Sequence, residues 1–243
     1  MDNSFQRIKK KFDTFSGKRY WGDDFDVRFY LISQLKKIQN KSILDIGGGI
    51  GVISSELEES NYKINLDLSF DDLKNCNQNY GEFLYSINGS MTFLPFKDNY
   101  FDCVICSHIL ELAKGIDIKN NLVIKNTVNQ YPTIDNVFKE INRVLKKDGV
   151  IYLTTPNNTY YKSSKLTYQE LTSSIKKYFE KYSLYFYNIY PNLSKKHRKF
   201  NLANSIPKIK LNFKNHSEII NSLLKNDEGL ERESVSFYAE IRK

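Results

Sequence analysis

The sequence has few cysteines, few histidines and no long hydrophobic run, and each of these absences narrows its function. Three cysteines in 243 residues argue against a disulfide framework. Three scattered histidines without cysteine or glutamate at ligand spacing argue against a metal site. No apolar stretch approaches the roughly 20 residues needed to cross a bilayer, and residues 1–11 are polar and basic, without the apolar centre of a signal peptide. We therefore expect a cytoplasmic protein without a membrane span or bound metal.

What is present is a globular composition with excess positive charge. Hydrophobic residues make up 40% of the chain and the net charge is +8. A positive balance is compatible with a nucleic-acid partner. Lysine and asparagine are spread along the whole chain, however, and the basic clusters at 7–11 and 195–199 are short. A nucleic-acid partner therefore stays open but is not favoured.

The pair Cys103 and Cys106 has the C-x-x-C spacing of some metal and redox sites. Both cysteines lie in the apolar run 101–106, which predicts a buried strand. Residues three apart in a strand point to opposite faces, so the two thiols should diverge. This geometry argues against a shared metal.

Residues 41–156 alternate short apolar strands with helical stretches, which is typical of βαβ units around a parallel sheet. The predicted strands are 42–46, 62–68, 82–87, 101–107 and 150–155, followed by 182–190 and 234–242. The predicted helices are 52–59, 71–79, 133–146 and one that begins after a capping box at 167–170. Three segments lie outside this core: an N-terminal helical extension or lid (1–40), an Asn-rich insertion (113–132), and a second insertion (191–233) with a short helix near 217–224.

A glycine-rich turn follows the first predicted strand. The turn reads D-x-G-x-G-x-G over residues 45–51, and glycine permits positive φ and a close approach to a ligand. Dinucleotide folds need a glycine where this chain has Val52, so a cofactor without a pyrophosphate suits the turn better. Asp67 ends the second strand, where a carboxylate can accept both ribose hydroxyls. The alternatives are a plain tight turn and an exposed loop aspartate.

Five motifs in order over residues 41–157 resemble those of the class I S-adenosylmethionine-dependent methyltransferases. The closest likeness is to the branch with ubiquinone- and menaquinone-biosynthesis enzymes and sugar or natural-product methyltransferases. The matching stretches are 43–51, 65–69, 89–96, 99–111 and 140–157, and residues 234–243 resemble the closing antiparallel strand.

The resemblance implies an α/β Rossmann-like sheet of seven strands in the order 3-2-1-4-5-7-6, flanked by helices, with residues 41–243 as the methyltransferase domain. It implies S-adenosylmethionine as cofactor. The amino-acid end of this cofactor would be held by Asp45 and by the backbone of Gly47, Gly48, Gly49 and Gly51. Ser107 would face its methionine portion. Asp67 would bind the ribose, Leu68 would pack on the adenine, and Ser90 and Met91 would line the adenine pocket.

Two departures and the N-terminal extension affect the details of this site. The family often has aspartate at position 90 and histidine after Glu111, and this chain has neither. In related enzymes the N-terminal part often folds over the cofactor, so Tyr20 or Trp21 could close the pocket and Arg28 could meet the cofactor carboxylate. Ordinary core or surface packing is the alternative for these residues. The tyrosines of 178–190 could line an acceptor pocket, and plain core is the alternative for them.

The leading hypothesis is methyl transfer to an O or N atom of a small molecule by a monomer or homodimer. His108 is the candidate catalytic base because it should lie beside the cofactor edge and can titrate near neutral pH. The alternative is that it only caps its strand or packs in the loop. An RNA or protein methyltransferase is the runner-up. The Asn/Asp-Pro-Pro-Tyr motif of many nucleic-acid enzymes is replaced by Ser107-His108-Ile109-Leu110. A non-catalytic nucleotide-binding scaffold on the same fold also stays open.

Overall fold

The computed structural model of the chain describes residues 25–114, 116–119, 122–125, 134–156, 166–187, 224–225 and 236–243. Tyr20, Trp21, both basic clusters and most of the helix expected near 217–224 lie outside these ranges. The one described part of that expected helix, Leu224, belongs to a short strand instead.

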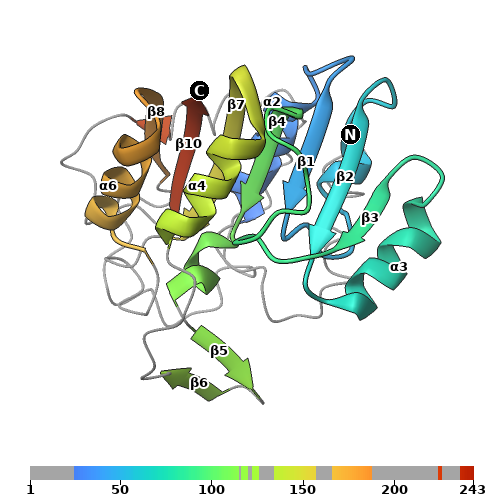
Figure 1. Cartoon of the computed structure of the whole chain (residues 1–243), viewed down its shortest axis with the longest axis horizontal. Coiled ribbons are helices and arrows are strands. Elements are labelled where there is room, and N and C mark those ends of the chain that lie inside the picture. The colour runs from blue at the N-terminus through green and yellow to red at the C-terminus, as the bar shows by residue number, and fades with distance from the viewer. Residues whose placement is uncertain are drawn as a thin grey trace, which may run out of the picture.

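The core is one mixed sheet in the order β3-β2-β1-β4-β7-β10-β8-β9 (Figure 1). Strands β1 to β4 and β7 run parallel, and β10 is antiparallel to both β7 and β8. The order 3-2-1-4-5-7-6 is therefore confirmed, with the two-residue β9 added at one edge. The strands are β1 (Ser42–Ile46), β2 (Tyr62–Asp67), β3 (Tyr85–Asn88), β4 (Phe101–Ser107), β7 (Leu145–Pro156), β8 (Lys181–Tyr187), β9 (Leu224–Lys225) and β10 (Ser236–Arg242).

The two central strands, β1 and β4, have the bounds that the sequence predicts. Both are covered on both faces, so each reads as a nearly continuous apolar run. The start of β7 was predicted wrongly: it begins at Leu145, five residues before the expected position 150. A register shift opposite β4, between Phe101 and Cys103, and the positive φ of Asp148 (64°) let the chain enter the sheet early.

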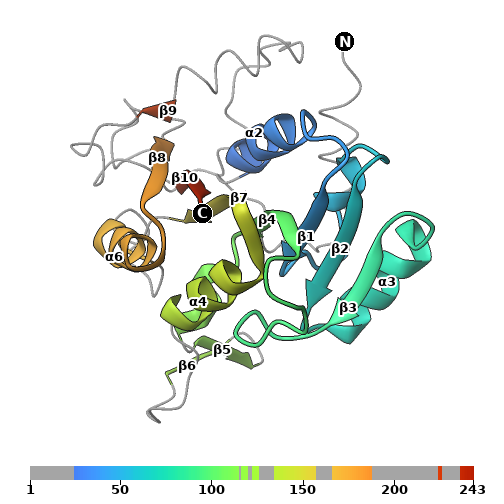
Figure 2. The ribbon, with the colours of Figure 1, turned by 45° about the horizontal axis from the view of Figure 1, so that its top comes forward.

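Two apolar layers cover the sheet. Helix α2 (Phe25–Leu35) packs on one face, and α4 (Ile134–Val144) and α6 (Tyr168–Tyr178) pack side by side on the other (Figures 1 and 2). Cys103 belongs to the α2 layer and Cys106 to the opposite layer, as strand alternation predicts. Among the described residues, no group of three or more potential metal-ligating side chains comes together.

The helices follow local signals. The capping box is confirmed, because Thr167 accepts the backbone N–H of Glu170 and the Glu170 carboxylate accepts that of Thr167. Helix α3 (Phe70–Tyr80) begins after Ser69, whose hydroxyl accepts the N–H of Asp72.

The helix predicted at 52–59 is wrong, because only a 3₁₀ turn, Ser54–Glu56, forms there. Leu57 is extended (φ −85°, ψ 154°) and buried. Its carbonyl accepts a hydrogen bond from the buried Lys63 ammonium at 3.1 Å. This hydrogen bond and the burial of Leu57 end the turn after three residues.

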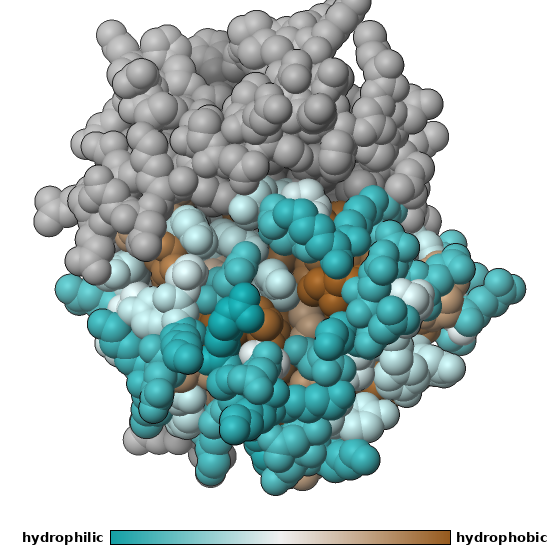
Figure 3. All heavy atoms as spheres, turned by 90° about the horizontal axis from the view of Figure 1, so that it is seen from above, coloured by the Kyte–Doolittle hydropathy of each residue, from teal (hydrophilic) through white to brown (hydrophobic). Residues whose placement is uncertain are grey.

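The amino ends of β1 and β4 are joined through Asp102. Its carboxylate accepts hydrogen bonds from Ser42 Oγ (2.6 Å), from the Ser42 N–H (2.9 Å) and from Lys146 Nζ (2.8 Å). Burial raises the pKa of Asp102, but these donors outweigh burial and lower the pKa to about 2. Viewed from above, where these ends lie, most of the described surface is hydrophilic, with smaller apolar areas (Figure 3).

The insertion at 113–132 contains an antiparallel pair, β5 (Ile116–Lys119) and β6 (Leu122–Lys125), which forms a separate sheet. Figure 1 places this pair below the carboxyl ends of the parallel strands. None of the helices in the described ranges is long and apolar enough to cross a membrane.

Candidate functional site at the carboxyl ends of the strands

The glycine loop after β1 adopts a conformation that favours glycine at three positions. Gly47, Gly49 and Gly51 have φ of 69°, 53° and 77°. The Gly47 N–H donates to the Leu66 carbonyl at 2.7 Å, which ties the loop to the end of β2. Among the described residues, only Asp67 Oδ2 would lie within 4 Å of a Cβ at Gly49, so these residues leave open space in front of it. The loop can therefore bring its backbone close to a ligand.

Asp67 lies beside this loop, as its position at the end of β2 predicts. Its Oδ2 accepts the N–H of Gly49 at 2.9 Å, and its Oδ1 accepts the N–H of Ser69 at 2.8 Å. Each carboxylate oxygen keeps further acceptor capacity, so Asp67 can still receive two hydroxyl donors. The two backbone bonds fix its orientation, which suits a residue that must hold a ribose.

Beneath the loop lie two buried oxygen acceptors that receive no hydrogen bond from the described residues, Asp45 Oδ1 and Asn65 Oδ1. Asn65 Nδ2 donates to the Gly49 carbonyl at 2.7 Å. This bond fixes the orientation of the amide, because the Asn65 oxygen cannot donate to that carbonyl in place of Nδ2. A Cβ on Gly48 would lie 2.2 Å from Asn65 Oδ1 and 2.7 Å from Asp45 Oδ2. Gly48 is therefore required because these two side chains fill the space below it.

The acidity of Asp45 reflects this burial. The residue is 1% exposed, and burial raises the pKa of its carboxyl to about 7, although the hydrogen bond from Ser54 (2.6 Å) lowers it and the Asp67 charge raises it further. A group that brings N–H donors or positive charge would compensate these acceptors. The amino-acid end of S-adenosylmethionine carries an ammonium, so the residues present fit that cofactor.

A second wall follows β3. Asn88 Nδ2 donates to the carbonyls of Asp67 and Leu68, both at 3.0 Å, and so fixes the start of the segment that carries Ser90 and Met91. Ser90 is half-buried and bonds to the Thr92 hydroxyl at 2.9 Å, and Met91 is buried. Three large apolar side chains of this region are exposed by more than two thirds: Leu68, Phe70 and Phe93. Exposed apolar side chains beside a polar loop are suited to a flat aromatic ligand.

The third wall follows β4. Ser107 Oγ lies 3.0 Å from Thr154 Oγ1, and the His108 N–H donates to the Thr154 carbonyl at 2.8 Å. His108 has φ of 54°, which is uncommon for a residue with a side chain and is often found at functional sites. A Cβ on Gly47 would lie 2.5 Å from Ile109 Cδ1, so the residue after His108 packs directly on the glycine loop.

The structure thus brings most of the predicted residues to one edge of the sheet. Arg28 is on α2 and buried, and Tyr20 is outside the described residues, so their contact with a cofactor stays a prediction. Sequence reasoning missed Asn65 and Ser54, whose side chains hold the loop and Asp45. A buried asparagine two residues before Asp67 in an apolar strand is a signal that could have identified Asn65.

Comparisons with known proteins agree with this arrangement. Residues 44–153 match a family model described as a methyltransferase domain. The uncharacterized protein MJ0638 of Methanocaldococcus jannaschii is 30% identical over 126 residues, which are 51% of this chain and 45% of that protein. The aligned stretch therefore spans less than half the length of this relative.

Two solved structures share the fold. A SAM-dependent methyltransferase from Archaeoglobus fulgidus is 17% identical, with 97% of this chain and 99% of that one covered at a TM-score of 0.56. The [4+2]-cyclase SpnF is 15% identical, with 93% and 84% covered at a TM-score of 0.54. At these identities the likeness shows the fold alone.

Proposed function

We infer that the chain is an S-adenosylmethionine-dependent methyltransferase, and we propose that it transfers the methyl group to an O or N atom of a small molecule. The observation that carries the proposal is the convergence of three segments on the matched domain's ligand edge. The Gly49 amide and the Asp67 carboxylate lie 2.9 Å apart, and Ile109 of the β4 end packs on Gly47. A cofactor on the loop would therefore have the β4 end beside it.

The cofactor, when bound, supplies a methyl group made electrophilic by the attached sulfonium. In this proposal Asp67 accepts the ribose hydroxyls, and Leu68 packs on the adenine beside Ser90 and Met91. The loop backbone and Asp45 receive the amino-acid end. Fixing the donor and acceptor in line can lower the barrier by roughly 7–11 kcal/mol, so positioning is the main task of these residues.

His108 is the proposed base where the acceptor must lose a proton. It follows β4 directly, and its backbone conformation is fixed by the bond to the Thr154 carbonyl. A positioned base typically contributes 10²–10⁴-fold. Changing His108 to Asn should therefore lower turnover with a hydroxyl or ammonium acceptor without weakening binding of the demethylated cofactor. Loss of that binding would assign His108 to the cofactor site instead.

Calorimetry with S-adenosylmethionine and S-adenosylhomocysteine tests the cofactor assignment. Asp67→Ala should abolish or weaken binding by at least about 100-fold, because two charge-assisted bonds are lost. Gly49→Val should do the same by filling the open space before the loop. The exposed Glu58 provides the control Glu58→Gln, with unchanged affinity expected. Unchanged affinity in both folded loop variants would reject the assignment.

A second candidate keeps the fold but not the reaction, because the cyclase SpnF has the same architecture. Incubation with labelled cofactor and mixtures of small amines, alcohols and phenols separates the two candidates, since only methyl transfer releases S-adenosylhomocysteine. The net charge of +8 keeps an RNA substrate as a further outcome. If the methyl label appeared on RNA and RNA binding depended strongly on salt, an RNA substrate would replace the small molecule in this proposal.

A further inference from the structure

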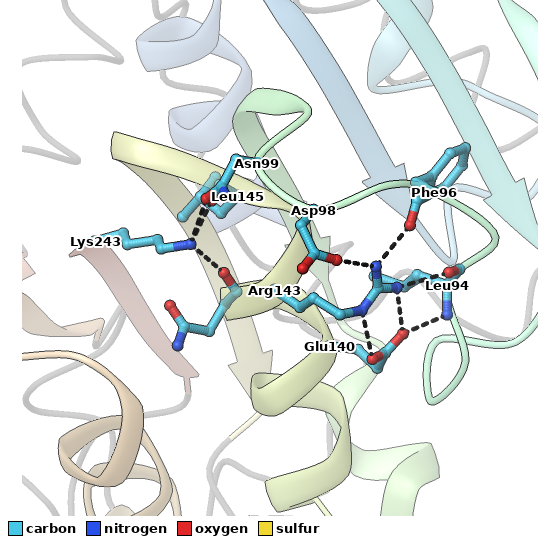
Figure 4. Close-up of polar contacts among 9 residues, drawn as sticks. Leu94, Phe96, Asp98, Asn99, Glu140, Arg143, Leu145 and Lys243 are labelled. Carbon is cyan, nitrogen blue, oxygen red and sulfur yellow. Dashed lines mark hydrogen bonds and ion pairs between the residues drawn. The ribbon is translucent and has the colours of Figure 1, made fainter.

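Arg143, in the last turn of α4, uses every N–H of its guanidinium. Its Nε and Nη2 donate to the two oxygens of Glu140 at 2.9 and 2.8 Å. The remaining donors reach the carbonyls of Leu94 (2.9 Å) and Phe96 (2.6 Å) and the carboxylate of Asp98 (2.9 Å). Figure 4 shows this set of contacts. A guanidinium has five N–H donors in a fixed plane, so the arrangement is saturated.

Glu140 completes the connection in the other direction. Its Oε2 accepts the N–H of Leu94 at 2.8 Å and also accepts a hydrogen bond from Arg143 Nη2. The pair therefore holds both the N–H and the C=O of Leu94. The Arg143 hydrogen bond lowers the pKa of Glu140, so this acceptor stays ionised in the range where proteins work.

The segment that Arg143 and Glu140 hold follows directly after the residues proposed to line the adenine pocket. Ser90 and Met91 lie four and three residues before Leu94. The other end of the segment is tied to β2 through Gly89, whose N–H donates to the Asp67 carbonyl at 3.1 Å. The backbone on both sides of Ser90 and Met91 is therefore held by hydrogen bonds, to β2 before them and to α4 after them.

The far side of α4 is fixed independently. Lys243 Nζ donates to Asn99 Oδ1 and to the carbonyls of Asn142 and Leu145, as Figure 4 also shows. The N–H of Asn99 in turn donates to the Arg143 carbonyl at 2.9 Å. Because the C-terminal turn of α4 is held from this side as well, it offers a rigid support for the guanidinium.

We propose that Arg143 and Glu140 are positioning residues that set adenine recognition by holding the segment after β3 in place without touching the cofactor. The inference rests on the proposed function. Its physical basis is that hydrogen bonds to charged groups keep a backbone fixed more strongly than neutral ones. Lysine at position 143 would keep the charge but cannot supply the planar set of five donors.

The test compares S-adenosylhomocysteine with S-inosylhomocysteine, which carries hypoxanthine in place of adenine. We expect the unchanged protein to bind the adenine compound about tenfold more tightly. Arg143→Lys should weaken binding of the adenine compound and reduce this preference to about twofold or less. A residue that only stabilised the fold would lower the folded fraction equally for both ligands and leave their ratio unchanged.

Two controls accompany this variant. Asp135 on the same helix pairs with Lys177 of α6, away from the segment after β3, so Asp135→Asn should leave the ratio unchanged. Glu58 is exposed and lies outside this set of contacts, so Glu58→Gln should also leave the ratio unchanged. Glu140→Gln serves if Arg143→Lys does not fold, and it should also lower the preference.

Amide hydrogen exchange gives a readout independent of ligand. Exchange at Leu94 should be at least about tenfold faster in Arg143→Lys, with exchange in β1 unchanged. An unchanged preference in a folded Arg143→Lys or Glu140→Gln protein would overturn the proposal. If the unchanged protein bound neither nucleoside compound, the proposed function itself would fail first.

Discussion

Replacement of Asp45 by Asn should stabilise the ligand-free protein at alkaline pH. The folded-state pKa of Asp45 is about 7, against 3.8 for the free side chain. Between these two values the folded chain binds more protons than the unfolded chain, so the free energy of unfolding falls as the pH rises. Below pH 3.8 both states are protonated, and above pH 7 both are ionised, so the penalty reaches its full size only above pH 7.

The magnitude follows from the difference of about 3 pKa units at 1.36 kcal/mol each, which sets an upper limit of roughly 4 kcal/mol. The introduced amide would carry no charge, and its oxygen could still accept the Ser54 hydroxyl. We therefore expect the variant to gain about 2–4 kcal/mol at pH 8 and almost nothing at pH 4.

Urea unfolding followed by far-ultraviolet circular dichroism at pH 4, 5.5, 7 and 8 measures this gain. Glu58→Gln, at an exposed carboxylate, is the control and should change stability by less than about 0.5 kcal/mol at each pH. A destabilised Asp45→Asn protein at pH 8, or a difference from the unchanged protein that stays constant with pH, would refute the reasoning. The same variant should bind S-adenosylmethionine more weakly, because a neutral amide compensates the cofactor ammonium poorly.

Three further changes probe the scaffold by chemical denaturation. Asp102→Asn should cost about 2 kcal/mol at neutral pH, because its lowered pKa stabilises the fold above pH 4 and this contribution is lost as the pH falls through 2; a pH-independent loss would contradict this. Gly51→Ala should lower the free energy of unfolding by about 2–5 kcal/mol, because φ at this position is 77° and the new Cβ would lie 2.6 Å from Cys76 Sγ. An unchanged stability would show that the loop can relax. Thr167→Ala should cost about 1 kcal/mol through loss of the capping box, with Thr167→Ser expected to retain most of it.

Much of the architecture was determined by the sequence itself, because local pattern and burial agree there. β1 and β4 are buried on both faces, so their apolar runs mark their ends. Helix α4 has its apolar residues at helical spacing, and the structure places its ends within two residues of the prediction. Asp67 could be assigned to the ligand edge because the carboxyl ends of parallel strands lie together.

Only the tertiary structure decided the features that depend on specific polar contacts of side chains. The helix expected at 52–59 is cut short by the Lys63 ammonium on the Leu57 carbonyl and by burial of Leu57, neither of which periodicity reveals. The Leu94 amide meets Glu140 across 46 positions of the chain, and Asn65 meets the Gly49 carbonyl across 16. The local sequence pattern indicates which faces of a helix or strand are apolar. It does not indicate which polar groups form hydrogen bonds, because those partners come together only when the sheet has formed.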